Sequence, residues 1–139
     1  MTSQIFFAID PLAVATTALF MMAVATVWFS PLFLGPLYER SLGRSEPALQ
    51  SGRETLTALA GTLIAFLCIE TLFAFALISA PLIGFSVRPL ALGLAVLVLS
   101  LAAVPVIWER RPLMYYAVQA GFGLAFVAGS LFILQYWPW

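Results

Sequence analysis

The stretch LTALAGTLIAFLCIETLFAFALISA, residues 56–80, decides the fold of this chain. Its side chains are apolar, small or hydroxyl-bearing, and Glu70 is its one carboxylate. A helix needs ~20 residues to cross the ~30 Å hydrocarbon layer of a membrane, and this run is long enough to do so. Because it lacks the alternation of a barrel strand, we interpret it as a transmembrane helix that satisfies its own backbone polar groups.

Three further apolar runs, none of which contains Asp, Glu, Lys or Arg, lie at residues 11–34, 90–108 and 113–137. Asp10 followed by Pro11 is typical of a helix N-cap and first turn, so the first run has a defined start. We therefore predict an all-α membrane protein with a single domain over residues 1–139. It is a four-transmembrane-helix bundle, with helices at about 11–34, 54–80, 89–108 and 112–137.

The composition excludes a soluble domain and a nucleic-acid-binding domain. Hydrophobic residues make up 63% of the chain and charged residues 9%, which leaves too little polar surface for a soluble protein of 139 residues. Six arginines balance six acids, so no basic stripe is available to bind nucleic acid. Cys68 is the only cysteine, so a disulfide within the chain is impossible.

The arginines predict the orientation of the helices in the membrane. Five of the six fall in the first and third connections, which share one side of a four-helix protein, and only Arg88 falls in the second. An excess of basic residues is typical of cytoplasmic loops. We therefore expect both termini outside and the first and third connections in the cytoplasm, where Arg110 and Arg111 anchor the third connection.

The segment WFSPLFLGPLY, residues 28–38, predicts an elbow after the first helix. Pro31 disfavours a helical conformation at Ser30, so the chain bends there. The segment is too apolar and aromatic for a solvated loop, and we expect it to lie along the membrane interface. A segment that gates a ligand is the alternative interpretation. The residues that define this interfacial elbow are Trp28, Ser30, Pro31, Gly35 and Tyr38.

The elbow and one later stretch resemble a known family. Two aromatic residues, Ser-Pro, an apolar run, glycine and tyrosine, all within residues 28–38, are similar to the opening signature of small bacterial four-helix membrane proteins catalogued as domain of unknown function 1761. The stretch ERRPL, residues 109–113, leads into YAVQAG, residues 116–121, and resembles the last third of that family. With the arginine pattern, the resemblance implies a multi-pass protein of the bacterial inner membrane with periplasmic termini. It implies no activity.

Few polar groups lie inside the predicted spans. Glu70 is the only ionisable carboxylate there, and Ser100 and Gln119 are the other polar candidates. An acid in a membrane is costly when charged and is a functional candidate by default. Burial in lipid without a basic partner favours the protonated acid, which can bond a hydroxyl at the same depth, such as Thr17, Ser100 or Ser130. A structural hydrogen bond, a contact to a partner or ligand, and a proton relay remain as alternatives.

The last predicted helix repeats a small residue at every fourth position, which places the four residues on one face. Helix association in lipid rests on close van der Waals contact, and small residues let two backbones approach. We expect this face to pack against another helix of the chain or against a second subunit. Its residues are Ala117, Gly121, Ala125 and Gly129.

The sequence favours a protein that is not an enzyme. It contains no histidine, no pair of a nucleophile and a base, and no cluster with metal-ligand spacing, and the residues identify no cofactor. We expect a non-catalytic membrane component, either an accessory subunit of a larger membrane complex or a self-associating protein. Its partners are then the lipid bilayer and other membrane subunits or itself. The alternative is a small transporter or ligand-binding bundle in which Glu70 lines a polar cavity.

Overall fold

The computed structural model describes residues 9–43 and 52–138, and in these ranges the chain forms helices and no strand. Four segments are long and apolar enough to cross a membrane, namely Pro11–Trp28, Thr55–Leu82, Val87–Trp108 and Leu113–Gln135. The predicted all-α fold with four helices of membrane-spanning length is therefore confirmed. In chain order the elements are α2 (Pro11–Trp28), α3 (Gly35–Ser41), α4 (Gly52–Ser79), the 3-10 helix η1 (Ala80–Ile83), α5 (Val87–Trp108) and α6 (Leu113–Gln135).

The first long helix is shorter than its apolar run. We expected a helix at about residues 11–34, but α2 ends at Trp28. Pro31 lacks a backbone N–H and disfavours a helical conformation at Ser30, which favours an end of the helix before this point. The other three long helices begin and end within two residues of the bounds expected from hydropathy.

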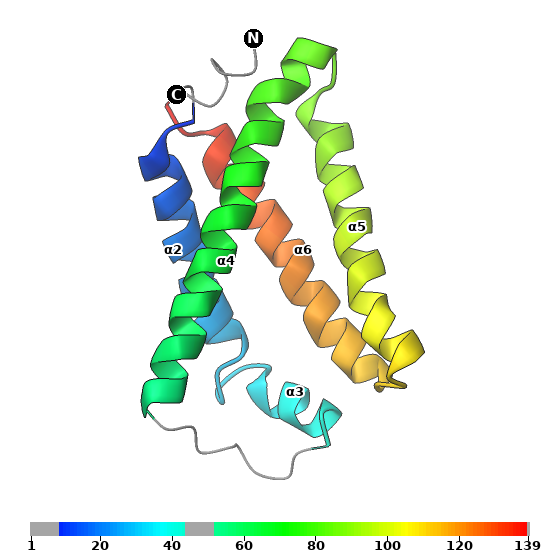
Figure 1. Ribbon diagram of the computed structural model, residues 1–139. Coiled ribbons are helices and arrows are strands. Elements are labelled where there is room, and N and C mark those ends of the chain that lie inside the picture. Colours follow the sequence, from blue (N-terminus) through cyan, green and yellow to red (C-terminus); the bar gives the residue numbers. More distant parts are fainter. Residues whose placement is uncertain (1–8, 44–51, 139) are drawn as a thin grey trace.

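Helices α2, α4 and α6 pack on one another and hold the core, while α5 stands to one side (Figure 1). Helix α5 packs mainly on α6, and no residue along its whole described length is buried. The buried apolar core comes from α2 (Ala13, Val14, Met21), α4 (Phe73, Ala74, Leu77) and α6 (Phe126, Val127, Leu131, Leu134). Three helices thus form the packed body, and the fourth is attached along one side.

The molecule has two ends, which we name by what lies there. The elbow end, at the bottom of Figure 1, holds α3, the start of α4 and the α5–α6 turn. The terminal end, at the top, holds the start of α2, the end of α6 and the α4–α5 turn. With ~1.5 Å of rise per residue, the 28 residues of α4 extend over about 42 Å and connect the two ends.

Asp10 fastens the start of α2 to the end of α6 at the terminal end. Its Oδ1 accepts a hydrogen bond from the amide of Leu12 at 2.8 Å, which confirms Asp10 as the N-cap of α2. Its Oδ2 accepts a second hydrogen bond from the indole Nε1 of Trp137 at 2.9 Å. One carboxylate therefore caps a helix and holds two segments together that are distant in sequence.

Candidate functional site

A tight turn at residues 29–34 carries the chain from α2 into α3. The carbonyl of Ser30 accepts hydrogen bonds from the amides of Phe33 and Gly35, each at 3.1 Å. Gly35 is buried where the turn closes, and a Cβ there would lie 2.5 Å from the carbonyl oxygen of Phe29 and 2.6 Å from that of Ser30. Backbone atoms cannot yield to a side chain at such distances, so the turn requires glycine at this position.

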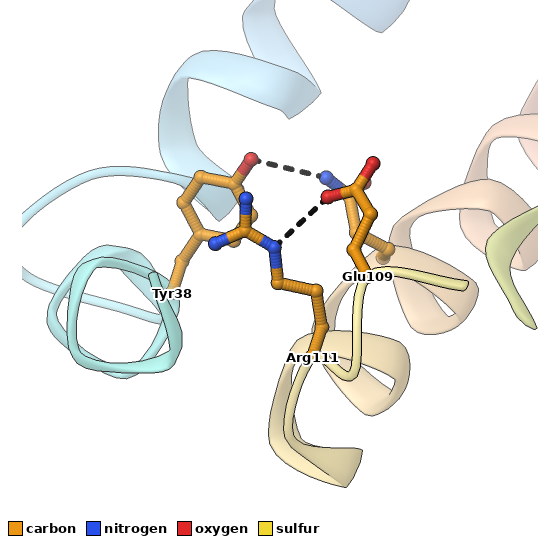
Figure 2. A network of polar contacts seen from close by, with 4 residues as sticks. Tyr38, Glu109 and Arg111 are labelled. Atoms are coloured by element: carbon orange, nitrogen blue, oxygen red, sulfur yellow. Dashed lines mark hydrogen bonds and ion pairs between the residues drawn. The ribbon is translucent and has the colours of Figure 1, made fainter. Parts of the chain in front are cut away.

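The elbow folds back onto the start of α6 through Trp28 and Tyr38. The indole Nε1 of Trp28 donates a hydrogen bond to the carbonyl of Val118 at 3.3 Å. The side-chain amide of Gln119 donates to the hydroxyl of Tyr38 at 3.2 Å (Figure 2), and the Tyr38 ring stacks on Tyr115 with centroids 5.8 Å apart. The two stretches that carry the family resemblance are therefore in direct contact.

Aromatic rings fill the inside of the elbow and join three helices. Phe29 packs on Phe122 of α6 with ring centroids 5.2 Å apart. Phe66 of α4 meets Phe126 of α6 edge to face at 4.8 Å, and Phe122 and Phe126 are 6.1 Å apart. Such tilted and edge-to-face pairs contribute ~0.5–1.5 kcal/mol each beyond the area that they bury. The rings therefore pack the elbow against α4 and α6.

Two hollows flank Gln119 and Phe122, which line both of them. One of about 360 Å³ lies between α5 and α6. The other, of about 370 Å³, lies where α2, α3, α4 and α6 meet, and we call it the elbow hollow. No charged side chain of the described residues lines either hollow. The polar side chains that line the elbow hollow are Thr26, Tyr38, Thr62 and Gln119.

Two larger hollows lie against α5 nearer the terminal end. One of about 600 Å³ lies between α5 and α6 and includes Arg88 and Gln135. The other, of about 530 Å³, lies between α4 and α5, and we call it the α4–α5 groove. Apart from one serine, its lining is apolar: Phe75, Ala76, Ser79, Ala80, Phe85, Pro89, Leu90, Gly93, Leu94 and Leu97.

Glu70 lies in the core and is bonded across helices to α6. The hydroxyl of Ser130 donates a hydrogen bond to its Oε1 at 2.6 Å, and both residues are fully buried. The second oxygen, Oε2, is also buried and has no hydrogen-bond partner among the residues that the structure describes. Thr17 is buried on α2, but its hydroxyl donates to the carbonyl of Ala13 in its own helix. Glu70 lines none of the four hollows described above.

The structure separates the polar residues that the sequence singled out inside the spans. Ser100 is exposed on α5, where its hydroxyl donates to the carbonyl of Val96 at 2.8 Å in the same helix. Gln119 lies at the elbow end and bonds Tyr38. Of the three hydroxyls expected near the depth of Glu70, the one on α6 is its partner. Glu70 and Gln119 therefore belong to different sites.

The small-residue face of α6 meets α2 at two glycines. A Cβ on Gly121 would lie 3.1 Å from a ring carbon of Trp28, and one on Gly129 would lie 3.0 Å from the Sδ of Met21. Both partners belong to α2, so this face packs within the chain over these turns. The close approach depends on small residues, because a larger side chain would push the two helices apart.

The rest of that face differs from the expectation. Ala125 is half-buried, whereas Ala117 is exposed, so the described helices of the chain do not cover Ala117 and its packing against a second subunit stays a prediction. The reason is the length of α2, which ends at Trp28 beside Gly121 and does not reach Ala117. The bend at Pro31 thus limits both the length of α2 and the length of its contact with α6.

Gly123 is a packing residue that the sequence analysis missed. A Cβ at this position would overlap the Cγ1 of Val98, so α5 approaches the backbone of α6 here. Gly123 lies outside the four-residue repeat. Its only signal is a glycine within a helix, a position where glycine is less favourable than alanine by ~1 kcal/mol. Gly61 and Gly93 also lie within helices but meet nothing within 4 Å, so this signal alone does not identify a close contact.

The α5–α6 turn carries the two arginines expected to anchor the third connection. The Nε of Arg111 lies 3.0 Å from Oε2 of Glu109 in a partly exposed ion pair (Figure 2). Arg110 has a positive φ of 53°, in the left-handed region. Exposed ion pairs stabilise by ~0–1 kcal/mol, so this pair contributes little to the stability of the fold. Elsewhere among the described residues, no three His, Cys, Asp or Glu residues form a group that could hold a metal ion.

The fold and the site define an all-helical protein with four helices of membrane-spanning length and an aromatic elbow packed on its last helix. The chain belongs to the family described as Protein of unknown function (DUF1761), which matches residues 12–134. The match includes the elbow and nearly all of the four long helices, and it confirms the family that the sequence resembled. No curated protein and no solved structure matches the chain.

Proposed function

We propose that this protein is a non-catalytic, multi-pass component of the bacterial inner membrane that associates with a further transmembrane helix along α5. The helix belongs to a larger complex in which the chain is an accessory subunit, or to a second copy of the chain. The observation that supports this proposal is the exposure of α5, which has no buried residue and borders the α4–α5 groove.

The lining of the α4–α5 groove suits a helix. Ala76, Ala80 and Gly93 line it, and a Cβ on Gly93 would meet nothing within 4 Å among the described residues. Small residues let helices approach closely in lipid, where van der Waals contact drives association. The hydroxyl of Ser79, also in the lining, is buried without a hydrogen-bond partner among the described residues.

Photocrosslinking in native membranes tests the association. A benzoyl-phenylalanine at Leu97, in the groove, is expected to give one adduct of defined mass, and the same probe at the exposed Leu19 of α2 is expected to give none. Gly93→Leu should remove the adduct, because the larger side chain fills the groove. Gly61→Leu is the matched control, because that glycine also lies in open space but outside the groove.

The mass of the adduct identifies the partner. An adduct of twice the chain mass supports self-association, and another defined mass supports an accessory subunit. Crosslinks to lipid alone would overturn the proposal, as would an adduct that Gly93→Leu leaves unchanged.

The transporter alternative has less support, because Glu70 lines none of the four hollows and contacts Ser130 within the core. A proton-flux assay in proteoliposomes separates the two functions. The accessory or self-associating protein is expected to show no flux either as the parent or as Glu70→Gln. Flux in the parent that Glu70→Gln abolishes would favour the transporter.

A further inference from the structure

Of the four hollows described above, the elbow hollow is lined by the most hydroxyl and amide side chains, four against two in the neighbouring hollow that also includes Gln119. Its polar side chains come from four helices: Thr26 of α2, Tyr38 of α3, Thr62 of α4 and Gln119 of α6. The rest of its wall is apolar and includes the rings of Phe29, Phe66 and Phe122. Pockets with apolar walls and a few converging polar groups are the usual form of small-molecule sites.

The hydrogen bonds already made in the hollow leave defined atoms for a ligand. The hydroxyls of Thr26 and Thr62 donate to the carbonyls of Met22 and Ala58 in their own helices, so each oxygen can still accept. Within the described chain, Gln119 makes one hydrogen bond, through Nε2 to Tyr38. Its Oε1 and its second N–H are therefore available. The hollow offers three acceptor oxygens and one donor.

The chemistry of the wall defines the ligand. No charged side chain lines the hollow, so an ionised group would lose its hydration without a counter-charge. Because acceptor oxygens are in excess, a suitable ligand donates a hydrogen bond, and a hydroxyl group does so. The three phenylalanine rings favour a ring in contact with them. Thr26 and Leu59, at the edge, are exposed, so the hollow opens between α2 and α4 toward the surrounding lipid.

We propose that the elbow hollow binds an uncharged, lipid-soluble molecule with a hydroxyl-bearing ring and an apolar tail. Its hydroxyl donates to one threonine oxygen and accepts from the second N–H of Gln119, its ring lies against the phenylalanines, and its tail extends into the lipid between α2 and α4. This proposal is independent of the association along α5. The elbow hollow lies at the elbow end and involves no residue of α5, whereas the α4–α5 groove lies nearer the terminal end.

Three probes that differ only in their head groups test the proposal on the full chain in lipid nanodiscs. Saturation binding of tritiated 4-octylphenol is measured after subtraction of empty nanodiscs, and octylbenzene and ionised 4-octylbenzoate compete for the site. We expect 4-octylphenol to bind at least about five-fold more tightly than octylbenzene, the range of one or two hydrogen bonds. We expect no competition by 4-octylbenzoate.

Gln119→Leu should remove the preference for the hydroxyl, so that 4-octylphenol and octylbenzene bind with similar affinity. If this variant fails to fold, a double variant, Thr26→Val with Thr62→Val, removes two of the acceptor oxygens and should reduce the preference instead. Its matched control is Thr57→Val with Thr71→Val, because those hydroxyls also donate within α4 but lie outside the hollow.

Equal affinity for 4-octylphenol and octylbenzene would overturn the proposal, because the hollow would then be a nonspecific apolar groove. Absence of saturable binding would overturn it as well. The proposal also fails if Gln119→Leu folds and still prefers the hydroxyl. If Gln119→Leu does not fold, the proposal fails when the threonine double variant keeps the preference. Loss of the preference in the control double variant would contradict the assignment to this hollow.

Discussion

The core holds one acid, and the contact that it makes is to a neutral hydroxyl. Glu70 and Ser130 are fully buried and 2.6 Å apart, and Oε2 of Glu70 has no partner among the described residues. Polar groups are costly in the apolar interior of a bundle, and interhelical hydrogen bonds reduce that cost only in part. The pair therefore connects α4 to α6 at one specific register.

We predict that Glu70→Gln unfolds at nearly the same temperature in detergent as the parent, because an amide oxygen still accepts from Ser130. Glu70→Leu should lower the free energy of unfolding by about 1 kcal/mol, the scale of hydrogen bonds between membrane helices. Adding Ser130→Ala to Glu70→Leu should have little further effect, because the bond is already absent. Ser100→Ala is the control. A Gln variant as unstable as the Leu variant would contradict this role.

The hydrogen bonds of Asp10 predict that the stability of the fold falls at acid pH. Hydrogen bonds from the Trp137 indole and the Leu12 amide lower the pKa of Asp10 from its ordinary value of 3.8. Because the folded pKa is the lower one, the stabilisation is present above the unfolded pKa and is lost as pH falls through the folded pKa. Asp10→Asn keeps an N-capping side chain but removes the charge, so it isolates this effect.

We expect Asp10→Asn to have a lower thermal midpoint than the parent near neutral pH and a midpoint that approaches the parent's in acid. Scans from pH ~7 to pH ~2 in one detergent measure the difference. Trp137→Phe, which removes the indole donor, should shift the acid transition of the parent to higher pH. A difference between Asp10→Asn and the parent that stays constant over the whole range would exclude this carboxylate as the cause.

At the scale of elements, α6 is the helix against which α2, α3 and α5 all pack. It packs against α2 at Gly121 and Gly129, against α5 at Gly123, and against α3 at Gln119. Glycines on two faces let neighbours approach from both sides. Helix α6 therefore determines the positions of α2 and α5. A substitution on the face of α6 that contacts α5 should test this packing most directly.

We predict that Gly123→Ala destabilises the fold by about 1–3 kcal/mol, the range for overpacked sites. The added methyl group meets Val98, whose β-branched side chain has little rotamer freedom in a helix. Adding Val98→Ala should restore much of the loss, because it removes the colliding group. Gly93→Ala is the control, since nothing lies near its Cβ position, and it should stabilise slightly. If Gly123→Ala and Gly93→Ala shift the unfolding temperature equally, α5 does not pack closely at this point.

At the scale of the whole molecule, the charges divide between the two ends. Arg40, Arg110 and Arg111 lie at the elbow end, and Arg88 lies at the terminal end, at the start of α5. The basic excess at the elbow end supports an orientation with α3 and the α5–α6 turn in the cytoplasm. In that orientation the elbow hollow faces the inner leaflet, and the link between Asp10 and Trp137 faces the periplasm.

Single cysteines test this orientation. In a Cys68→Ser background, Ser86→Cys should react with a membrane-impermeant thiol reagent in intact cells, and Glu109→Cys should react only after the membrane is opened. Both positions are exposed, and they lie at opposite ends of α5. Labelling of Glu109→Cys from the periplasm would reverse the assignment.

The hydropathy pattern, the N-cap of α2 and the bend after α2 were predictable from the sequence, because each is a local property. An apolar run long enough to cross a membrane forms a helix wherever it packs, Asp10 before Pro11 caps the start of α2, and Pro31 limits the length of the same helix. The family resemblance was readable for the same reason, since its residues lie in two short stretches. The contact between the two stretches was not predictable, because it depends on hydrogen bonds from Trp28 to Val118 and from Gln119 to Tyr38.

Only the tertiary structure decided which faces meet. It pairs Glu70 with Ser130, leaves Ala117 and Ser100 exposed, and brings Val98 against Gly123. In a soluble bundle an apolar stripe marks the buried face, but the four long helices here are apolar on every side, as helices facing lipid are. Packing between such helices depends on shape and on single hydrogen bonds. These interactions act between residues far apart in the chain, so the pattern along any one helix does not contain them.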